Sequence, residues 1–95
     1  MFLKIMSKEL ENLRKLIDKI DFEILQKLAK RFSLVSKIAE YKTKNNLPIY
    51  DKKREKGILE TRKILANQFK LNKSMIEKIF RTIFKESRFK QKNDH

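Results

Sequence analysis

The sequence predicts an all-α fold of three helices, the first of them very long. Apolar residues recur at spacings of three and four along most of the chain, and charged residues make up 39% of it. One Gly and one Pro leave little material for hairpin turns, for a glycine-rich phosphate loop or for a dinucleotide fingerprint. We therefore expect the 95 residues to form one domain over 1–95, without a P-loop or Rossmann-type nucleotide fold.

The first helix is predicted to run from about Ser7 to about Lys44, because neither Gly nor Pro interrupts this stretch. Ser7 is a candidate N-cap with Glu9 in the first turn, and residues 1–6 are then an N-terminal extension. The apolar positions form a stripe along one side of this helix: Leu10, Leu13, Ile17, Ile20, Ile24, Leu28, Val35 and Ile38.

The second helix is predicted to follow a break at residues 44–50, where Pro48 and two asparagines interrupt the periodic pattern. Asp51 is the candidate N-cap, since its carboxylate can accept a hydrogen bond from the first turn. This helix is expected to end near Phe69.

The third helix is predicted after a three-residue turn. Asn72 is its candidate N-cap, and the helix is expected to extend from Lys73 to about Arg88 or beyond. The polar residues 90–95 are expected to form a tail that frays over 92–95.

The length of the first helix predicts a dimer. A helix over 7–44 would be roughly 55 Å long, whereas a compact domain of this size has a diameter of about 30 Å. The chain cannot cover such a helix alone, so the stripe from Leu10 to Ile38 must pack on another surface. The simplest surface is the same helix of a second copy related by a two-fold axis. An extended monomer that packs on a different protein is the alternative.

Composition excludes several kinds of chemistry. The chain has no Cys, and its one His is the last residue, so it cannot build a thiolate zinc site, a disulfide, a His-activated nucleophile or a His-ligated metal. No window approaches the roughly 20 apolar residues of a membrane span, and residues 1–6 are too short for a signal sequence. We expect a cytoplasmic protein with no metal, no membrane contact and chemistry based on Lys, Arg, carboxylates and amides.

The net charge of +13 would suit a nucleic-acid partner. However, 19 of the 25 basic residues are lysines scattered singly through every segment. This distribution favours a solvated surface over a dedicated nucleic-acid patch, so no nucleic-acid partner is expected.

Several polar residues lie on the apolar faces of the predicted helices. Two cations of the first helix share a face with core positions, and the third helix extends its apolar face with a hydroxyl and an amide. The second helix begins with a carboxylate, a guanidinium and a second carboxylate. These residues are Arg31 and Lys42, Ser87 and Gln91, and Asp51, Arg54 and Glu55. Each alone has an ordinary structural explanation, but a pocket among the helices lined by Arg, Lys, Gln and Ser with one carboxylate would fit a small dianion that carries a hydroxyl.

Together with Arg14, these residues resemble the motifs of the all-helical (type II) chorismate mutases, here in monofunctional form. The matching runs cover the chain from Arg14 to Gln91: Leu13-Arg14-x-x-Ile17-Asp18-x-x-Asp21, Leu28-Ala29-Lys30-Arg31, Ile38-Ala39-Glu40-Tyr41-Lys42, Pro48-x-x-Asp51-x-x-Arg54-Glu55 and Phe84-Lys85-Glu86-Ser87-x-x-x-Gln91. The resemblance implies an intertwined homodimeric helical bundle of three-helix protomers whose long first helices cross. It also implies one site per protomer, completed by an arginine of the other chain.

The resemblance implies that three residues bind the two carboxylates of chorismate. They are Arg31, Arg14 of the neighbouring subunit and, as a helper, Ser87. Helical geometry is compatible with this division, because Arg14 lies about 100° around the helix from Arg31.

The other implied roles concern the ether oxygen and the ring hydroxyl of chorismate. Lys42 and Gln91 are the implied catalytic residues, which donate hydrogen bonds to the ether oxygen. Glu55 accepts a hydrogen bond from the ring hydroxyl, Asp51 lines the pocket, and Arg54 holds Glu55 in place.

The implied reaction is the rearrangement of chorismate to prephenate in phenylalanine and tyrosine biosynthesis. One pericyclic step breaks a C–O bond as a C–C bond forms, so no cofactor is needed, and catalysis comes from conformer restriction and electrostatic stabilisation of the ether oxygen. One alternative is an isochorismate-pyruvate lyase of the same fold, which should not need the Glu55 clamp. The other is a basic helical nucleic-acid-binding module, which the net charge alone supports.

Overall fold

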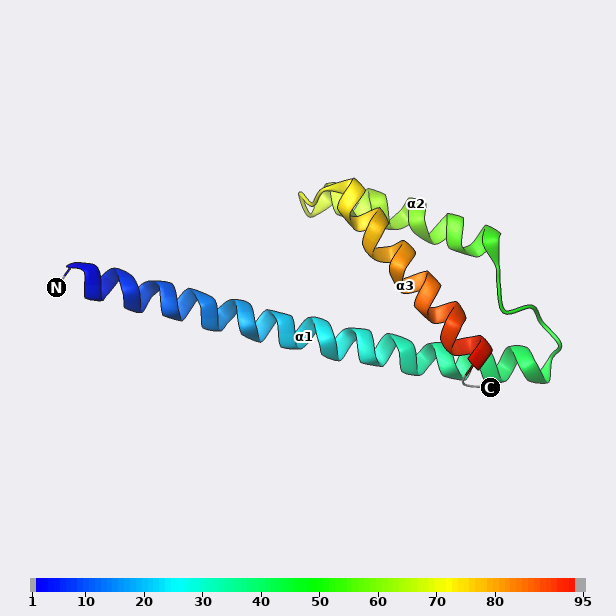
Figure 1. The fold of residues 1–95 in the computed structure, drawn as a ribbon. Helices are drawn as coiled ribbons and strands as arrows, with labels where there is room; N and C mark the ends of the chain where they lie inside the picture. Colours follow the sequence, from blue (N-terminus) through cyan, green and yellow to red (C-terminus); the bar gives the residue numbers. More distant parts are fainter. Residues whose placement is uncertain (1, 94–95) are drawn as a thin grey trace. The chain divides into compact units, whose positions relative to one another are not determined.

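Three α-helices make up the chain in this computed structural model, which describes residues 2–93 and the side chains of residues 7–93. In chain order they are α1 (Phe2–Lys44), α2 (Lys52–Gln68) and α3 (Lys73–Asn93) (Figure 1). No strand occurs between residues 2 and 93. The predicted all-α fold with a very long first helix is therefore confirmed.

Helix α1 begins earlier than predicted. Ser7 lies inside the helix, which already includes Phe2, so the predicted N-cap at Ser7 is wrong. The stretch 2–6 contains no Gly, Pro or other strong helix breaker, and nothing in it stops the helix from extending to Phe2. Met1, the first residue of the expected extension, lies outside the described residues.

Both α1 and α2 end in the hydrogen-bond pattern of a Schellman motif. After α1, Asn46 has a φ of 54°, and the N–H of Leu47 donates to the carbonyl of Lys42 at 2.9 Å. After α2, Lys70 has a φ of 57°, and the N–H of Leu71 donates to the carbonyl of Ala66 at 2.8 Å. The two turns thus use Asn and Lys where glycine is the usual residue.

The predicted caps of α2 and α3 are confirmed. Asp51 Oδ1 accepts a hydrogen bond from the N–H of Arg54, and Asn72 Oδ1 accepts one from the N–H of Met75, both at 2.9 Å. Helix α2 ends at Gln68, one residue before the predicted Phe69. The short side-chain oxygens of Asp and Asn explain these starts, because they satisfy N–H groups that have no partner within the helix.

Helix α3 extends further than predicted. It continues to Asn93, so residues 90–93 are helical, whereas a polar tail was expected from residue 90, with fraying over 92–95. Gln91 is buried within this last part, and Lys90 and Lys92 place positive charge at the negative end of the helix dipole. Residues 94–95, the rest of the expected tail, lie outside the described residues.

The chain divides into two compact units, residues 1–33 and 34–95. Over its described residues, the first unit is the leading part of α1. Its apolar stripe is exposed to between 47% and 56% at Leu10, Leu13, Ile17, Ile20 and Ile24. A stripe of this length that keeps about half of its surface exposed is unusual for a stable monomer.

The second unit contains the last turns of α1 together with α2 and α3, which pack against each other. Its buried apolar residues come from all three helices: Val35, Ala39, Leu59, Ala66 and Phe84. Two buried polar residues, Ser87 and Gln91, belong to the same core. This unit carries six of the eight residues predicted to form the site.

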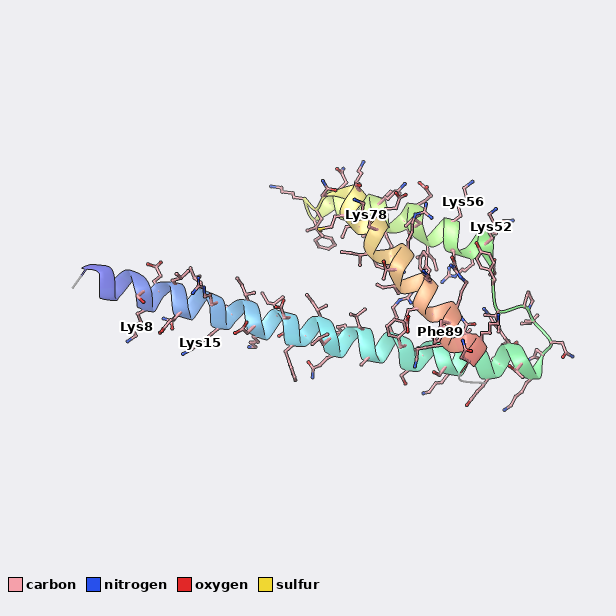
Figure 2. All side chains as sticks on the ribbon, viewed as in Figure 1. Lys8, Lys15, Lys52, Lys56, Lys78 and Phe89 are labelled. Carbon is pink, nitrogen blue, oxygen red and sulfur yellow. The ribbon has the colours of Figure 1, made fainter. Side chains whose placement is uncertain are left out.

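Lysines are exposed along all three helices. Examples are Lys8 and Lys15 on α1, Lys52 and Lys56 on α2, and Lys78 on α3 (Figure 2). Across residues 2–93, no helix combines the length and the apolar character that crossing a membrane requires.

Candidate active site

Lys42 and Gln91 meet where the end of α1 and the end of α3 approach each other in the second unit. The Lys42 ammonium group donates to Gln91 Oε1 at 3.2 Å and to the carbonyl oxygen of Ile49 at 2.8 Å. Because an ammonium group can only donate, the amide of Gln91 must turn its oxygen toward Lys42, and its NH₂ group is then available as a donor elsewhere. The pair therefore offers two hydrogen-bond donors, one of them charged, at a single place.

Gln91 is buried to an unusual degree for an amide side chain. It is 8% exposed, and Ser87, one helical turn earlier, is 7% exposed. The Ser87 hydroxyl donates to the carbonyl of Ile83 at 2.7 Å. The prediction that α3 carries a hydroxyl and an amide on its apolar face is confirmed, since both side chains are buried in the core.

Glu55 on α2 forms an ion pair with Arg88 on α3. Arg88 Nη1 donates to Glu55 Oε1, and the two side chains are only 34% and 22% exposed. The guanidinium carbon of Arg88 also lies 4.7 Å from the ring centroid of Tyr50, close enough for a cation–π contact. The carboxylate thus has a partner that is itself held by a ring.

The sequence did not predict the partner that Glu55 has in the structure. Arg54 was predicted to hold Glu55 in place, but the ion pair that the described residues show for Glu55 is with Arg88. Arg54 is exposed, and its backbone N–H donates to the capping carboxylate of Asp51. Arg88 was not among the predicted site residues, although arginine is scarce in this chain, with six residues against 19 lysines. That scarcity was the one available signal.

A short stretch of the α1–α2 loop links the two pairs. The carbonyl of Ile49 accepts the hydrogen bond from Lys42, and the ring of the next residue, Tyr50, lies against Arg88. The Lys42–Gln91 pair and the Arg88–Glu55 pair are therefore both tied to residues 49–50. Their α3 members are three residues apart, on neighbouring positions of one face.

A groove of about 280 Å³ opens between α2 and α3 beside Glu55. Tyr50, Leu59 and Phe84 contribute to its walls near Glu55, and Lys42, Ser87 and Gln91 do not line it. Further along the groove, the hydrogen bond from Lys63 to the Glu77 carboxylate, at 2.9 Å, raises the pKa of Lys63 and lowers that of Glu77. This second ion pair ties α2 to α3.

The remaining predicted site residues are Arg14 and Arg31, both in the first unit. Arg14 is exposed and Arg31 is half-buried. The structure therefore places Ser87 and Gln91 in the core of the second unit, bonds the half-buried Lys42 to Gln91, and places Asp51, Arg54 and Glu55 at the start of α2. The catalytic and binding roles of all eight residues stay predictions.

The chain is an all-α protein in which a half-buried lysine is bonded to a buried amide, and comparison with known proteins specifies its family. The chorismate mutase type II family matches residues 13–92. This chain belongs to that family, and the resemblance found in the sequence motifs is confirmed.

Individual relatives agree with the family assignment. The chain is 45% identical over 84 residues to a bifunctional chorismate mutase/prephenate dehydratase of Buchnera aphidicola, which covers 88% of this chain and 22% of that protein. It is 37% identical over 78 residues to a T-protein of Haemophilus influenzae, covering 82% and 21%. These two relatives are long, and the chain spans about a fifth of their length.

A relative of similar length is the chorismate mutase of Methanocaldococcus jannaschii. It is 34% identical over 87 residues, which cover 92% of this chain and 88% of that protein. A protein named only for the mutase activity thus matches nearly end to end.

Proposed function

We propose that this chain is a chorismate mutase, which rearranges chorismate to prephenate in the biosynthesis of phenylalanine and tyrosine. The observation that carries the proposal is the hydrogen bond between half-buried Lys42 and buried Gln91 in a chain of the type II chorismate mutase family. Two adjacent donors are what an ether oxygen needs when it gains negative charge.

The proposed mechanism places Lys42 and the NH₂ group of Gln91 on the ether oxygen of chorismate. An acceleration of about 10⁶ requires the barrier to fall by roughly 8 kcal/mol. Each of two such donors can supply about 3 to 4 kcal/mol, by analogy with oxyanion-hole donors. Restriction of chorismate to its compact diaxial conformer supplies the remainder. Because the step is pericyclic, the mechanism uses no metal, cofactor or proton transfer.

The other predicted residues bind the substrate in this proposal. Glu55 accepts the hydrogen bond of the ring hydroxyl, and Asp51 and Arg54 lie beside it at the start of α2. The Glu55 carboxylate, which is oriented by its ion pair with Arg88, supports the mutase over an isochorismate-pyruvate lyase, because the lyase should not need a hydroxyl clamp.

The two carboxylates of chorismate are assigned to arginines of the first helix. We propose that Arg31 and Ser87 of one chain and Arg14 of a second chain bind them. The exposed stripe of the first unit supports an intertwined homodimer of this kind, because a second copy of the same stripe would cover it. A cytoplasmic location stays a prediction from the sequence.

The nucleic-acid alternative is not favoured. It explains the net charge of +13 but gives no reason for Ser87 and Gln91 to be buried beside a lysine. The lysines of this chain are distributed along all three helices, which is typical of a solvated surface.

The proposal is tested by following the loss of chorismate with the purified protein while measuring prephenate and pyruvate together. Prephenate without pyruvate is expected. Lys42→Ala should lower kcat by about 10² to 10³, the loss of one such donor, whereas Lys44→Ala, at an exposed position of the same last turn, should leave it unchanged. Pyruvate as the product would identify the lyase instead, and no consumption of chorismate would contradict both activities.

A further inference from the structure

Arg88 joins three parts of the second unit. It lies on α3, donates through Nη1 to Glu55 on α2, and stacks its guanidinium group 4.7 Å from the ring centroid of Tyr50 in the α1–α2 loop. The side chains of Arg88 and Glu55 are 34% and 22% exposed, so the ion pair is partly shielded from water. Partial burial strengthens such a pair, because water competes less for both groups.

A glutamate at the start of a helix has three side-chain torsions and, without an anchor, samples many rotamers. The planar guanidinium of an arginine restricts such a carboxylate more than an ammonium group would, since its donors have fixed directions. A carboxylate has four lone-pair positions, and the Arg88 bond uses one of them at Oε1. Glu55 can therefore be held by Arg88 and still accept a hydroxyl.

We propose that Arg88 is a positioning residue for catalysis. It holds the Glu55 carboxylate in the orientation that accepts the ring hydroxyl of the substrate, and Tyr50 in turn holds the guanidinium. The inference rests on the role given to Glu55 in the proposed function. It adds a residue that acts through Glu55 and does not touch the substrate.

The placement of Arg88 supports this role. Its sequence neighbour Ser87 and the residue three positions later, Gln91, are the buried polar residues of α3. Tyr50 directly follows Ile49, whose carbonyl accepts the Lys42 hydrogen bond. Arg88 and Tyr50, which orient Glu55, are thus near neighbours in sequence of Gln91 and Ile49, which bind Lys42.

A second arginine of α3 provides a matched comparison. Arg81 pairs with Glu77 at 3.5 Å, and its side chain is 65% exposed. That pair lies within one helix, at positions i and i+4, and neither residue has a proposed catalytic role. Arg81→Met removes the same charge from the same helix and controls for a general loss of attraction for a dianionic substrate.

The test is a double-mutant cycle of the whole dimeric protein, using Arg88→Met, Glu55→Gln and the two combined, with chorismate as substrate. We expect Arg88→Met to lower kcat/KM by roughly tenfold, the size typical of coupled neighbours. The changes in kcat and in KM that make up this loss should have the same proportions in Arg88→Met as in Glu55→Gln. In the Glu55→Gln background, Arg88→Met should change kcat/KM by less than about twofold. Arg88→Lys should recover part of the loss, and Arg81→Met should resemble the wild type.

Three outcomes would overturn the inference. Unchanged kinetics in a folded Arg88→Met dimer would show that the ion pair is only structural. Losses that multiply in the double variant would show that Arg88 acts on the substrate directly. Unaffected kinetics of Glu55→Gln would remove the proposed role of Glu55 together with this inference. The first outcome differs from this one, because it removes the inference but leaves the role of Glu55 intact if Glu55→Gln is impaired. Circular dichroism checks folding, and Arg88→Gln replaces Arg88→Met under the same criteria if the methionine variant does not fold.

Discussion

Single residues in this chain owe their orientation to the hydrogen-bonding limits of their neighbours. Lys42 can only donate, so it determines which end of the Gln91 amide faces it. The buried amide is satisfied on its oxygen side and retains a donor on the other side. The same restriction predicts what a carboxylate would do at this position, because a carboxylate can accept from Lys42 but donates nothing when ionised.

Gln91→Glu should convert a nearly flat pH dependence into one that falls toward neutral pH. An ionised carboxylate would keep the hydrogen bond from Lys42, but it would place negative charge against the ether oxygen where the amide donated. Protonation restores a donor, so kcat should recover on acidification. The measurement is kcat from about pH 4.5 to 8 for both proteins, with circular dichroism as the folding control. If the variant follows the wild type over that range, Gln91 does not contact the reacting oxygen.

At the scale of the helices, short polar side chains cap the start of two helices, and residues with a left-handed backbone conformation follow the end of two helices. Asp51 and Asn72 cap α2 and α3. Asn46 and Lys70 take positive φ after α1 and α2. Asparagine tolerates this region, whereas a lysine with its Cβ and long side chain is strained there. Lys70 is therefore the position at which a local change should stabilise the fold.

Lys70→Gly should raise the free energy of unfolding by about 1 kcal/mol, since glycine adopts positive φ without the steric cost of a Cβ. Urea unfolding at equal protein concentration measures the change, with an unchanged m-value as the sign that only stability differs. The matched control is Lys78→Gly, an exposed position inside α3, which should lower stability by about 1 kcal/mol. Destabilisation by both substitutions would contradict the strain assigned to Lys70.

At the scale of the whole molecule, the first unit carries an apolar stripe that its own side chains leave about half exposed. Burying such a stripe against a second copy is worth about 25 cal/mol for each Å² removed from water. The proposed dimer gives this surface a partner and also brings Arg14 of one chain toward the site of the other. Both consequences can be measured separately.

The chain should form an obligate dimer. Light scattering at micromolar concentration should give a mass twice the 11.5 kDa of one chain, and the unfolding midpoint should rise with protein concentration. A monomer that is folded and unfolds cooperatively would contradict the proposed role of the stripe.

Arg14 should act across the dimer interface. Arg14→Ala and Lys42→Ala homodimers should each be nearly inactive, because every site lacks one group. When the two variants are unfolded together and refolded, random pairing makes half of the dimers mixed, and each mixed dimer holds one intact site and one doubly damaged site. Activity should therefore return to about a quarter of the wild-type value. No recovery would mean that Arg14 serves its own chain or no site at all.

The sequence alone determined the features that depend on residues within about one helical turn. Asp51 and Asn72 were predictable as caps because a cap is a contact with a residue three positions later. The burial of Ser87 and Gln91 followed from their place on the stripe of α3. The start of α1 was missed because Ser7 can begin a helix or lie inside one, and no local breaker before it decided between them.

Only the tertiary structure decided that Arg88 meets Glu55, whereas the resemblance alone had implied that Lys42 and Gln91 share one site. Arg88 and Glu55 are 33 positions apart, and Lys42 and Gln91 are 49 apart, so no helical period connects either pair. The resemblance to the family implied Arg54 as the residue that holds Glu55. The packing of α2 against α3 instead brings Arg88 to the carboxylate and the ring of Tyr50 to Arg88. Neighbours on a helix are set by its period, whereas neighbours between helices depend on how side chains of different length fill the space between them.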